Sequence, residues 1–281
     1  MPDVAVYFRR ATPWWGGPKR RRKVSGMTTA LVTGGTSGIG AAFARALAAR
    51  GHDLVLVARN AQRLDSAAAD LRSRYGVQVE VLSADLADRK QVLAVAERIA
   101  DPDHPVDLVI NNAGFGLHER LAIADTTPHE HAIDVMIRAV LILGAAAART
   151  MKERGRGRIV NVSSTAGFVT MGGYSAVKAW VTSYSESLAV ELRGTGVTVT
   201  ALCPGWVRTE FHQRAGLKAS AIPAKLWLDA DRLVTDALRD IDRGVVVSIP
   251  SKRYRILMWF ARHAPRSVVR TISAQMVRSR R

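Results

Sequence analysis

The sequence is poor in cysteine, and no apolar run approaches the roughly 20 residues that cross a bilayer. Cys203 is the only cysteine, which excludes an intrachain disulfide and a cysteine-rich metal site, and we expect no metal. The basic N-terminal stretch lacks the apolar middle of a secretory signal. We therefore expect a soluble protein in a reducing compartment, the cytoplasm.

Acidic residues are scarce where positive charge gathers. Of the formal net charge of +17, residues 1–27 carry +6, and residues 252–281, which contain no acid, carry +9. Residues 28–251 keep only +2. A nearly neutral body with basic ends argues against a surface built to follow a phosphate backbone, so we expect no nucleic-acid partner.

From Thr29 onward, short β-branched runs alternate with Ala-rich segments of helical period, a pattern of repeated βαβ units. It predicts an α/β fold, a Rossmann-like doubly wound parallel sheet of about seven strands with helices on both faces. The expected strands are 30–33, 53–58, 77–82, 106–110, 157–162, 197–202 and 245–249. The expected helices between them include 38–50, 60–75, 89–100, 129–153 and 174–193.

The first strand runs into a glycine-rich turn and then a helix. The turn consists of Gly34, Gly35, Thr36, Ser37, Gly38, Ile39 and Gly40. Glycines permit a tight turn and a close backbone approach to a pyrophosphate, whose charge is held by N–H groups at the helix start. A lone glycine cluster is often only a turn, but its position between strand and helix favours dinucleotide binding.

Tyr174 and Lys178 are four residues apart and share one helix face. A tyrosine that titrates near ~10 exchanges protons poorly at neutral pH, and a nearby ammonium group would lower its pKa. Ser163 and Ser164 end the preceding strand, at the sheet edge where ligands of such folds bind, and a serine there can hydrogen-bond a substrate oxygen. In isolation, a Tyr and a Lys at this spacing are more often a surface pair.

Taken together, these motifs resemble the short-chain dehydrogenase/reductase family, in particular its ketoacyl and carbonyl reductase-like members. The resemblance covers about residues 28–250. It rests on Thr33-Gly34-(x)3-Gly38-x-Gly40, Asn111-Asn112-Ala113-Gly114, Ser164, Tyr174-(x)3-Lys178 and Pro204-Gly205, in that order. It implies that Tyr174 donates or accepts the proton, that Lys178 holds the nicotinamide ribose and lowers the Tyr174 pKa, and that Ser164 positions the substrate oxygen.

The resemblance also implies a set of cofactor contacts beyond the glycine-rich turn. These are Asp85 and Leu86 toward the adenine, Asn111, Ala113 and Gly114 after the fourth strand, Tyr174, Lys178, and Pro204, Gly205, Val207 and Thr209, the last toward the nicotinamide carboxamide.

Two departures from the family pattern bear on the roles that the resemblance implies for these residues. Ser164 and Tyr174 are ten residues apart, closer than the family often has them, so Ser163 remains a rival. The family's helical Asn, which supports a water relay to the lysine, falls near Met136, whose side chain has no equivalent donor or acceptor. We expect altered proton supply rather than loss of activity.

Cofactor choice is predicted from the end of the second strand, where an acid would bind the ribose 2′-hydroxyl and a basic residue would suit a 2′-phosphate. The sequence there is Val57-Ala58-Arg59-Asn60, with no acid. Arg59 can contact a phosphate with two hydrogen bonds, so NADP(H) is favoured over NAD(H). The alternative is that Arg59 is a solvated helix-start residue.

We divide the chain into a disordered basic extension (1–26), a dinucleotide-binding catalytic domain (27–250) and a basic amphipathic C-terminal tail (251–281). Met27 is a candidate start of translation. The tail suits peripheral contact with a membrane or, equally, packing on the domain edge.

We therefore predict an NADP(H)-dependent oxidoreductase that moves a hydride to or from a lipophilic ketone or alcohol such as a ketoacyl chain. We also expect the protein to be a homo-oligomer. Loops 168–173 and 209–228 would line the substrate pocket, with an apolar lid made by Leu217, Ile222, Leu226, Trp227 and Leu228. The alternatives are a catalytically silent dinucleotide sensor and a membrane-surface binding protein on the same fold.

Overall fold

The computed structural model describes residues 28–117, 119–209 and 223–278, with side chains described as far as residue 275. Seven strands form one sheet in the order β3-β2-β1-β4-β5-β6-β7, and all neighbouring pairs are parallel. They are β1 (Thr29–Thr33), β2 (Asp53–Ala58), β3 (Val79–Ser83), β4 (Val106–Asn111), β5 (Gly157–Val162), β6 (Val197–Leu202) and β7 (Val247–Ser248). The predicted doubly wound parallel sheet is confirmed. The predictions for residues 1–26 and Met27 fall outside the described residues.

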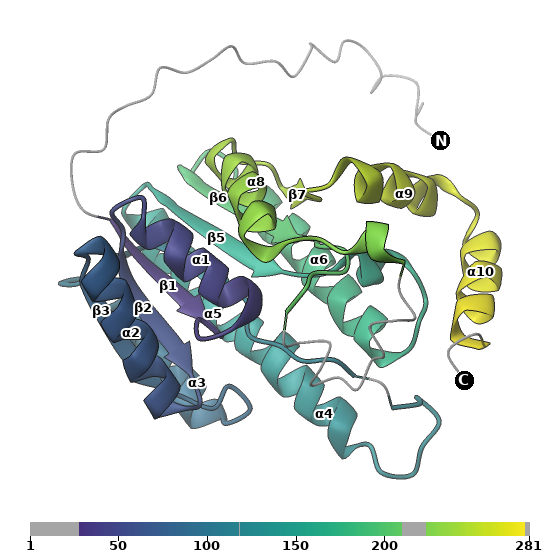
Figure 1. The fold of residues 1–281 in the computed structure, drawn as a ribbon, viewed down its shortest axis with the longest axis horizontal. Helices are drawn as coiled ribbons and strands as arrows, with labels where there is room; N and C mark the ends of the chain where they lie inside the picture. The colour runs from purple at the N-terminus through teal and green to yellow at the C-terminus, as the bar shows by residue number, and fades with distance from the viewer. Residues whose placement is uncertain (1–27, 118, 210–222, 279–281) are drawn as a thin grey trace, which may run out of the picture.

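Helices cover both faces of the sheet (Figure 1). One layer contains α1 (Gly38–Ala48), α2 (Ala61–Tyr75) and α8 (Ala230–Asp242), and the other contains α3 (Arg89–Ala100), α5 (Ala139–Glu153) and α6 (Gly173–Glu191). Strand residues alternate between the two cores: in β2, Leu54 and Leu56 face the first layer, and Val55 and Val57 the second. Burial on both faces explains why the strands read as continuous apolar runs.

The structure differs from the prediction at β7, β3 and α8, among other elements. β7 has two residues rather than five, because only Val247 and Ser248 pair with β6 at this edge of the sheet. β3 begins at Val79, two residues later than expected. α8 is not among the expected helices, although the Asp229 side chain caps its start by accepting a hydrogen bond from the Arg232 N–H.

A continuous helical segment runs from Thr127 to Arg154. It consists of α4 (Thr127–Ile133), a π-helical turn η2 (Asp134–Arg138) and α5. By length and composition it is long and apolar enough to cross a membrane, so the expectation of no such segment was wrong. Half of its most apolar part is buried inside the fold, where α5 packs against α3, β4 and β5. Core packing accounts for its apolar composition.

The C-terminal segment forms two helices, α9 (Lys252–His263) and α10 (Arg266–Arg278). Both lie beyond the β7 edge, at the yellow end of the chain in Figure 1. Tyr254 and Met258 of α9 are buried, as are Val269 and Ser273 of α10. The segment is therefore docked on the domain edge along one side of each helix.

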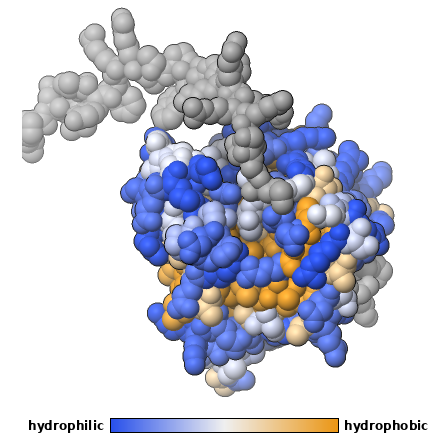
Figure 2. Space-filling model, turned by 90° about the vertical axis from the view of Figure 1, so that its left-hand side faces the viewer, coloured by the Kyte–Doolittle hydropathy of each residue, from blue (hydrophilic) through white to orange (hydrophobic). Residues whose placement is uncertain are grey.

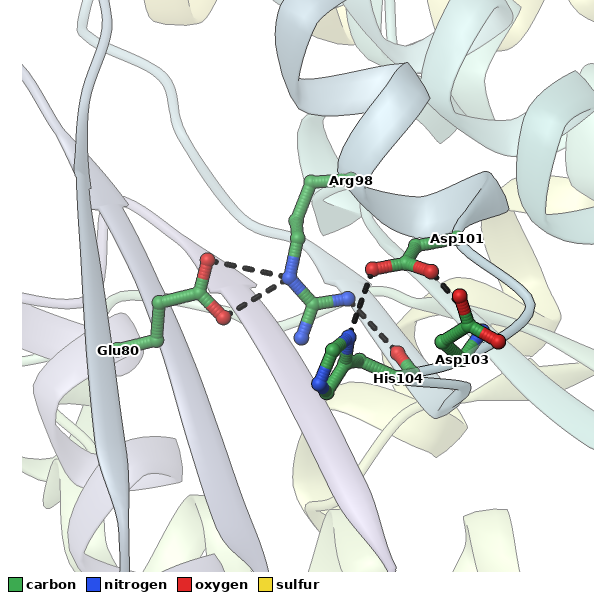
Figure 3. A network of polar contacts seen from close by, with 5 residues as sticks. All are labelled: Glu80, Arg98, Asp101, Asp103 and His104. Carbon is green, nitrogen blue, oxygen red and sulfur yellow. Dashed lines mark hydrogen bonds and ion pairs between the residues drawn. The ribbon is translucent and has the colours of Figure 1, made fainter.

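A polar network joins the opposite edge strand, β3, to the end of α3 (Figure 3). Arg98 Nε donates to both Glu80 carboxylate oxygens, at 2.8 and 3.1 Å, and the guanidinium also donates to the His104 carbonyl at 2.8 Å. The His104 ring lies 3.0 Å from the Asp101 carboxylate. On this side of the molecule hydrophilic residues surround a central apolar band (Figure 2). Charged side chains such as Glu80, on the edge strand β3, protect that strand from pairing with another chain.

Candidate functional site

The strand order fixes where a ligand can bind. β1 and β4 are neighbours although they are not consecutive, and open parallel sheets bind ligands at the carboxyl ends of the strands at such a point. The glycine-rich turn joins β1 to α1 there. Gly34 and Gly38 have φ of +67° and +54°, and a Cβ on Gly40 would overlap the Gly34 carbonyl oxygen. The Ser37 side chain makes no capping bond to α1, which leaves the first-turn N–H groups for an anion.

Thr33 and Asn112 hold the two strands of this crevice together. Thr33 Oγ1 accepts hydrogen bonds from the backbone N–H groups of Asn112, at 2.9 Å, and Ala113, at 3.0 Å. Asn112 Nδ2 donates in return to the Thr33 carbonyl at 2.9 Å. Sequence reasoning counted both residues only as motif positions. Their hydrogen bonds keep the segment 111–114 against the glycine-rich turn.

A groove of about 490 Å³ lies between the glycine-rich turn and the start of α2. It is lined by Thr36, Asn60, Gln62, Arg63, Ser66 and Ala67. Arg59 is exposed and directly precedes Asn60, which caps α2, but its side chain does not line the groove. Arg63, which sequence reasoning missed, does. Its position one helical turn after Arg59 was the available signal.

The turn after β3 is fixed by Asp85. Its Oδ1 accepts from the Ala87 N–H at 3.0 Å, and its own N–H donates to Gln91 Oε1 at 2.8 Å. Leu86, expected beside the adenine, is 6% exposed and its side chain packs in the core. A ligand contact from Leu86 would therefore come from its backbone.

Asn111 lies at the end of β4 with 4% of its surface exposed. Its Nδ2 donates to Asn161 Oδ1 at 2.9 Å, and Asn161 Nδ2 donates to Ser185 Oγ at 2.9 Å. Among the described atoms, Asn111 Oδ1 has no hydrogen-bond partner. A buried acceptor of this kind is costly unless something donates to it, and a bound cofactor would supply such a donor.

The three candidate catalytic residues converge at the carboxyl end of β5. Lys178 Nζ donates to the Val162 carbonyl at 2.8 Å and lies 5.6 Å from the centroid of the Tyr174 ring. Ser164 hydrogen-bonds to the Tyr174 side chain. The spacing of four on α6 thus places Tyr174 and Lys178 on one face, as the sequence predicts.

Ser163, the rival of Ser164, is occupied elsewhere. Its hydroxyl donates to the Lys178 carbonyl at 2.7 Å and lies 2.7 Å from Thr182 Oγ1. Ser163 is 2% exposed, whereas Ser164 is half-buried. The geometry assigns Ser163 to the contact between β5 and α6, and Ser164 to the site.

Burial dominates the titration of the two ionisable groups. It raises the pKa of the Tyr174 phenol well above its ordinary value, and the hydrogen bond with Ser164 opposes that rise. The lowering of the Tyr174 pKa that we expected from Lys178 is not observed. Burial also lowers the pKa of Lys178 to about 8. Both shifts favour the neutral forms of these groups.

Met136 occupies the place expected for the family's Asn. It is 1% exposed in the π-helical turn η2. A Cβ on Gly114 would lie 3.0 Å from the Met136 Sδ and 3.7 Å from Lys178 Nζ. A thioether and a glycine thus lie close to the ammonium group, where the family would place an amide.

The segment after β6 closes the other side of the crevice. A Cβ on Gly38 would lie 3.3 Å from Thr209 Cβ, so Thr209 faces the glycine-rich turn. The Pro204 carbonyl accepts from Thr165 N at 3.0 Å, which ties this segment to the short helix η3 (Thr165–Phe168). Val207 is 3% exposed and forms a bridge with Leu228.

Tyr254 of α9 packs beneath this segment. A Cβ on Gly205 would overlap the Tyr254 ring. The Tyr254 hydroxyl accepts from the Trp206 N–H at 3.1 Å and donates to the Leu226 carbonyl at 2.8 Å. Of the predicted lid, Leu226, Trp227 and Leu228 are half-buried here, and Leu217 and Ile222 lie outside the described residues.

The loop 168–173 before Tyr174 is also contacted by the C-terminal helices. The Arg262 guanidinium lies 5.5 Å from the centroid of the Phe168 ring, and the Thr170 N–H donates to Ser273 Oγ at 3.2 Å. On the other side, a Cβ on Gly173 would lie 2.7 Å from His129 Nδ1. Both predicted pocket loops therefore depend on contacts that the motifs do not include.

Within the described ranges, no three His, Cys, Asp or Glu side chains cluster as a metal site would require. Cys203 is buried, and burial raises the pKa of its thiol to about 11.

Comparison with known proteins agrees with this geometry. The sequence model of the short chain dehydrogenase family matches residues 28–219. The chain is 40% identical over 190 residues, 66% of its length and 72% of the relative's, to a protein named as a ketoacyl reductase of the monensin polyketide synthase of Streptomyces virginiae.

Two solved structures have a similar fold. A short-chain dehydrogenase from Sphingobium yanoikuyae in complex with NADPH is 39% identical with a TM-score of 0.77, covering 82% of this chain and 92% of its own. A bulky-bulky ketone specific alcohol dehydrogenase from Comamonas testosteroni is 34% identical with a TM-score of 0.72, covering 82% and 90%. With its parallel sheet, glycine-rich crevice and Ser-Tyr-Lys site, this chain belongs to the short-chain dehydrogenase/reductase family of oxidoreductases.

Proposed function

We propose that the protein is an NADP(H)-dependent reductase of lipophilic ketones, working reversibly on the corresponding alcohols, with Tyr174 as the acid and base. The observation that carries this proposal is the convergence of Ser164, Tyr174 and Lys178 at the carboxyl end of β5. A dinucleotide sensor without activity would not need a hydroxyl, a phenol and an ammonium group at one point.

The residues of the crevice fit a dinucleotide. Glycines at 34 and 40 leave backbone where a Cβ would collide, and the start of α1 has first-turn N–H groups without a side-chain cap. Asn111 Oδ1 is a buried acceptor without a partner among the described atoms. We infer that these groups, with Asp85, Ala113, Gly114 and the segment 204–209, hold the cofactor. When bound, NADPH supplies the hydride that reaches the carbonyl carbon.

The chain's own residues then manage the carbonyl oxygen. Ser164 donates a hydrogen bond to that oxygen and holds it beside Tyr174. Tyr174 donates its phenolic proton to the oxygen as the alcohol forms, and takes it back in the reverse reaction. Lys178, fixed by the Val162 carbonyl, places an ammonium group near Tyr174, and a positive charge there favours the phenolate form.

A preference for NADP(H) is supported by Arg59 and Arg63 at the start of α2. Arg63 lines the groove beside Thr36, and Arg59 precedes it. Two guanidinium groups favour a 2′-phosphate over a 2′-hydroxyl. The NADPH complex of the Sphingobium relative is consistent with this preference.

A lipophilic substrate is supported by the half-buried apolar side chains of Leu226, Trp227 and Leu228, since Leu228 pairs with the segment 206–208 after β6. The names of two relatives, a ketoacyl reductase and a ketone-specific alcohol dehydrogenase, agree with this class. We further infer a homo-oligomer in the cytoplasm, a reducing compartment that suits a chain whose one cysteine is a buried free thiol.

The test is to incubate purified protein with NADPH and a panel of ketones of increasing apolar size, and to follow loss of the reduced nicotinamide absorbance. Turnover that increases with the apolar size of the ketone supports the proposal. Binding of NADPH with no turnover on any ketone or alcohol would favour the dinucleotide sensor instead.

A further inference from the structure

The outward side of α9 is apolar. Its buried side is formed by Tyr254 and Met258, one turn apart. Ile256 and Phe260, also one turn apart, are 62% and 60% exposed, and Trp259 is 56% exposed. With Leu257, which is 53% exposed, four large apolar side chains are exposed on one short helix, and this is unusual for a surface that meets only water.

This apolar side is held in place by the inward contacts of the same helix. Tyr254 is hydrogen-bonded on the Trp206 and Leu226 backbone, and the Arg253 guanidinium donates to the Lys225 carbonyl at 2.8 Å. The helix is therefore fixed on the domain without using Ile256 or Phe260. Ile256 and Phe260 are therefore exposed although the helix that carries them is firmly held.

Basic residues flank the apolar side. A groove of about 630 Å³ runs between α9 and the β7 edge, and Arg243, Arg255 and Arg262 line it together with Trp259. The one carboxylate in the groove, that of Asp240, accepts a hydrogen bond from Ser248 at 2.7 Å. Residues 252–281 carry a net charge of +9 with no acid. Apolar and tryptophan side chains beside arginines match an anionic phospholipid surface, in which headgroup phosphates meet the arginines and the acyl boundary meets the apolar groups.

Charge disfavours a second copy of this chain as the occupant. A symmetric contact through α9 would bring two segments of +9 together with no acid on either. Among the described residues of α9, only Arg262 forms an ion pair. Its partner is Glu186, at 3.5 Å, and both side chains are half-exposed. An anionic partner removes this repulsion, and a second copy adds to it.

We propose that α9 and α10 form a docking surface for an anionic lipid bilayer. α10 extends the surface with Val268 and Ile272, 44% and 51% exposed. The same two helices contact the loops that precede Tyr174 and follow β6. If the proposed function holds, docking brings the entrance for a lipophilic substrate close to the bilayer that contains it.

The experiment is co-sedimentation of full-length protein with vesicles of phosphatidylglycerol and phosphatidylcholine, or of phosphatidylcholine alone. We expect binding to the anionic vesicles only, weakening as salt rises. The double variant Ile256→Ser, Phe260→Ser should lower the partition coefficient at least tenfold. The matched control Leu121→Ser, Val190→Ser removes two apolar side chains of similar exposure, 64% and 63%, elsewhere on the surface and should bind as the wild type does.

A second pair of variants tests the charge. Lys252→Glu, Arg255→Glu should lower binding about tenfold or more, while Lys90→Glu, Lys152→Glu, with the same change of net charge on α3 and α5, should have a much smaller effect. Thermal unfolding confirms that each variant is folded. If inorganic phosphate, at the same concentration as the lipid phosphate, releases the protein from the anionic vesicles, the ligand is a free anion and the proposal is overturned.

Two other results would also overturn it: no sedimentation of wild-type protein with anionic vesicles at low salt, or a dimer that dissociates in Ile256→Ser, Phe260→Ser. The second would show that another copy covers α9. Vesicle binding is measured without substrate or turnover, so its failure is separate from failure of the reductase assignment.

Discussion

The ammonium group of Lys178 donates a 2.8 Å hydrogen bond to the carbonyl oxygen of Val162, the last residue of β5. This bond connects the second turn of α6 to the strand that leads into Ser164. The sheet thereby sets the position of Lys178 relative to Ser164, so these two side chains are preorganised before any ligand binds.

Tyr174→Phe removes only the phenolic hydroxyl group, and with it the transferable proton, and should lower kcat by at least a thousandfold, while the Kd for NADPH stays within a few-fold of the wild type. Steady-state kinetics and fluorescence titration measure the two quantities separately. Turnover retained within tenfold would show that another group handles the proton.

The pH profile of ketone reduction should have an alkaline limb near pH 8. The pKa of Lys178 is lowered to about 8, so the ammonium form, and its support of the phenolate, is lost as the pH rises through that value. The measurement is kcat/KM between pH 6 and 10. In Lys178→Arg, whose guanidinium stays charged over this range, the limb should disappear even though absolute activity falls. A flat wild-type profile up to pH 10 would contradict the assignment.

The two adjacent serines should respond differently to alanine. Ser164→Ala should reduce kcat, because its hydroxyl hydrogen-bonds the Tyr174 side chain, and should lower the free energy of unfolding by only about 0.5–1 kcal/mol through loss of the bond that it accepts from the Ala166 N–H at 3.1 Å. Ser163→Ala should lower the free energy of unfolding by about 1–3 kcal/mol, because it leaves buried partners on α6 without its hydrogen bonds. Urea unfolding and kinetics on both variants test this, and the reverse pattern would restore Ser163 as the catalytic serine.

Arg59→Asp and Arg63→Asp should each weaken NADPH binding about ten- to a hundredfold, since a charged hydrogen bond contributes roughly 1.5–3 kcal/mol. NADH binding should change little or improve. Arg74→Asp, at the far end of the same helix, is the control. If the wild type binds both cofactors equally, neither arginine selects the phosphate.

Gly40→Ala should destabilise the fold by about 3 kcal/mol and abolish cofactor binding, because the new Cβ would overlap the backbone of Gly34. Gly51→Ala is the control: its φ is +79° but nothing lies within 4 Å of its Cβ. That change should cost only the strain of the left-handed conformation, about 1–2 kcal/mol. Equal losses would mean that strain, rather than collision, explains the glycine at position 40.

The sheet could be predicted because its strands are buried on both faces. Runs such as Asp53–Ala58 are apolar throughout, and the Ala-rich segments between them keep a helical period. α8 was missed although its apolar stripe is regular, since no motif drew attention to it. β7 was overestimated because an edge strand ends where its one neighbour stops pairing, which depends on tertiary structure.

The site was predicted where local spacing controls geometry, as for Tyr174 and Lys178. It could not be predicted where the partner is distant in sequence. The choice between Ser163 and Ser164 depends on Thr182, and the role of Thr33 on Asn112, which is 79 residues away. The burial of Tyr174, which raises the pKa of its phenol, could not be predicted either, because no short motif reports burial.

The contact between Gly205 and Tyr254 bears on how freely the C-terminal helices can be exchanged. Removing α9 would uncover the Trp206 N–H and the Leu226 carbonyl together, and leave a gap where the phenol ring meets Gly205. A chimera that takes its last thirty or so residues from a relative must therefore bring that relative's loop after β6 with it. The tail and the loop thus form one structural unit, and a chain that ends at residue 251 would lose the contacts that fix the loop after β6.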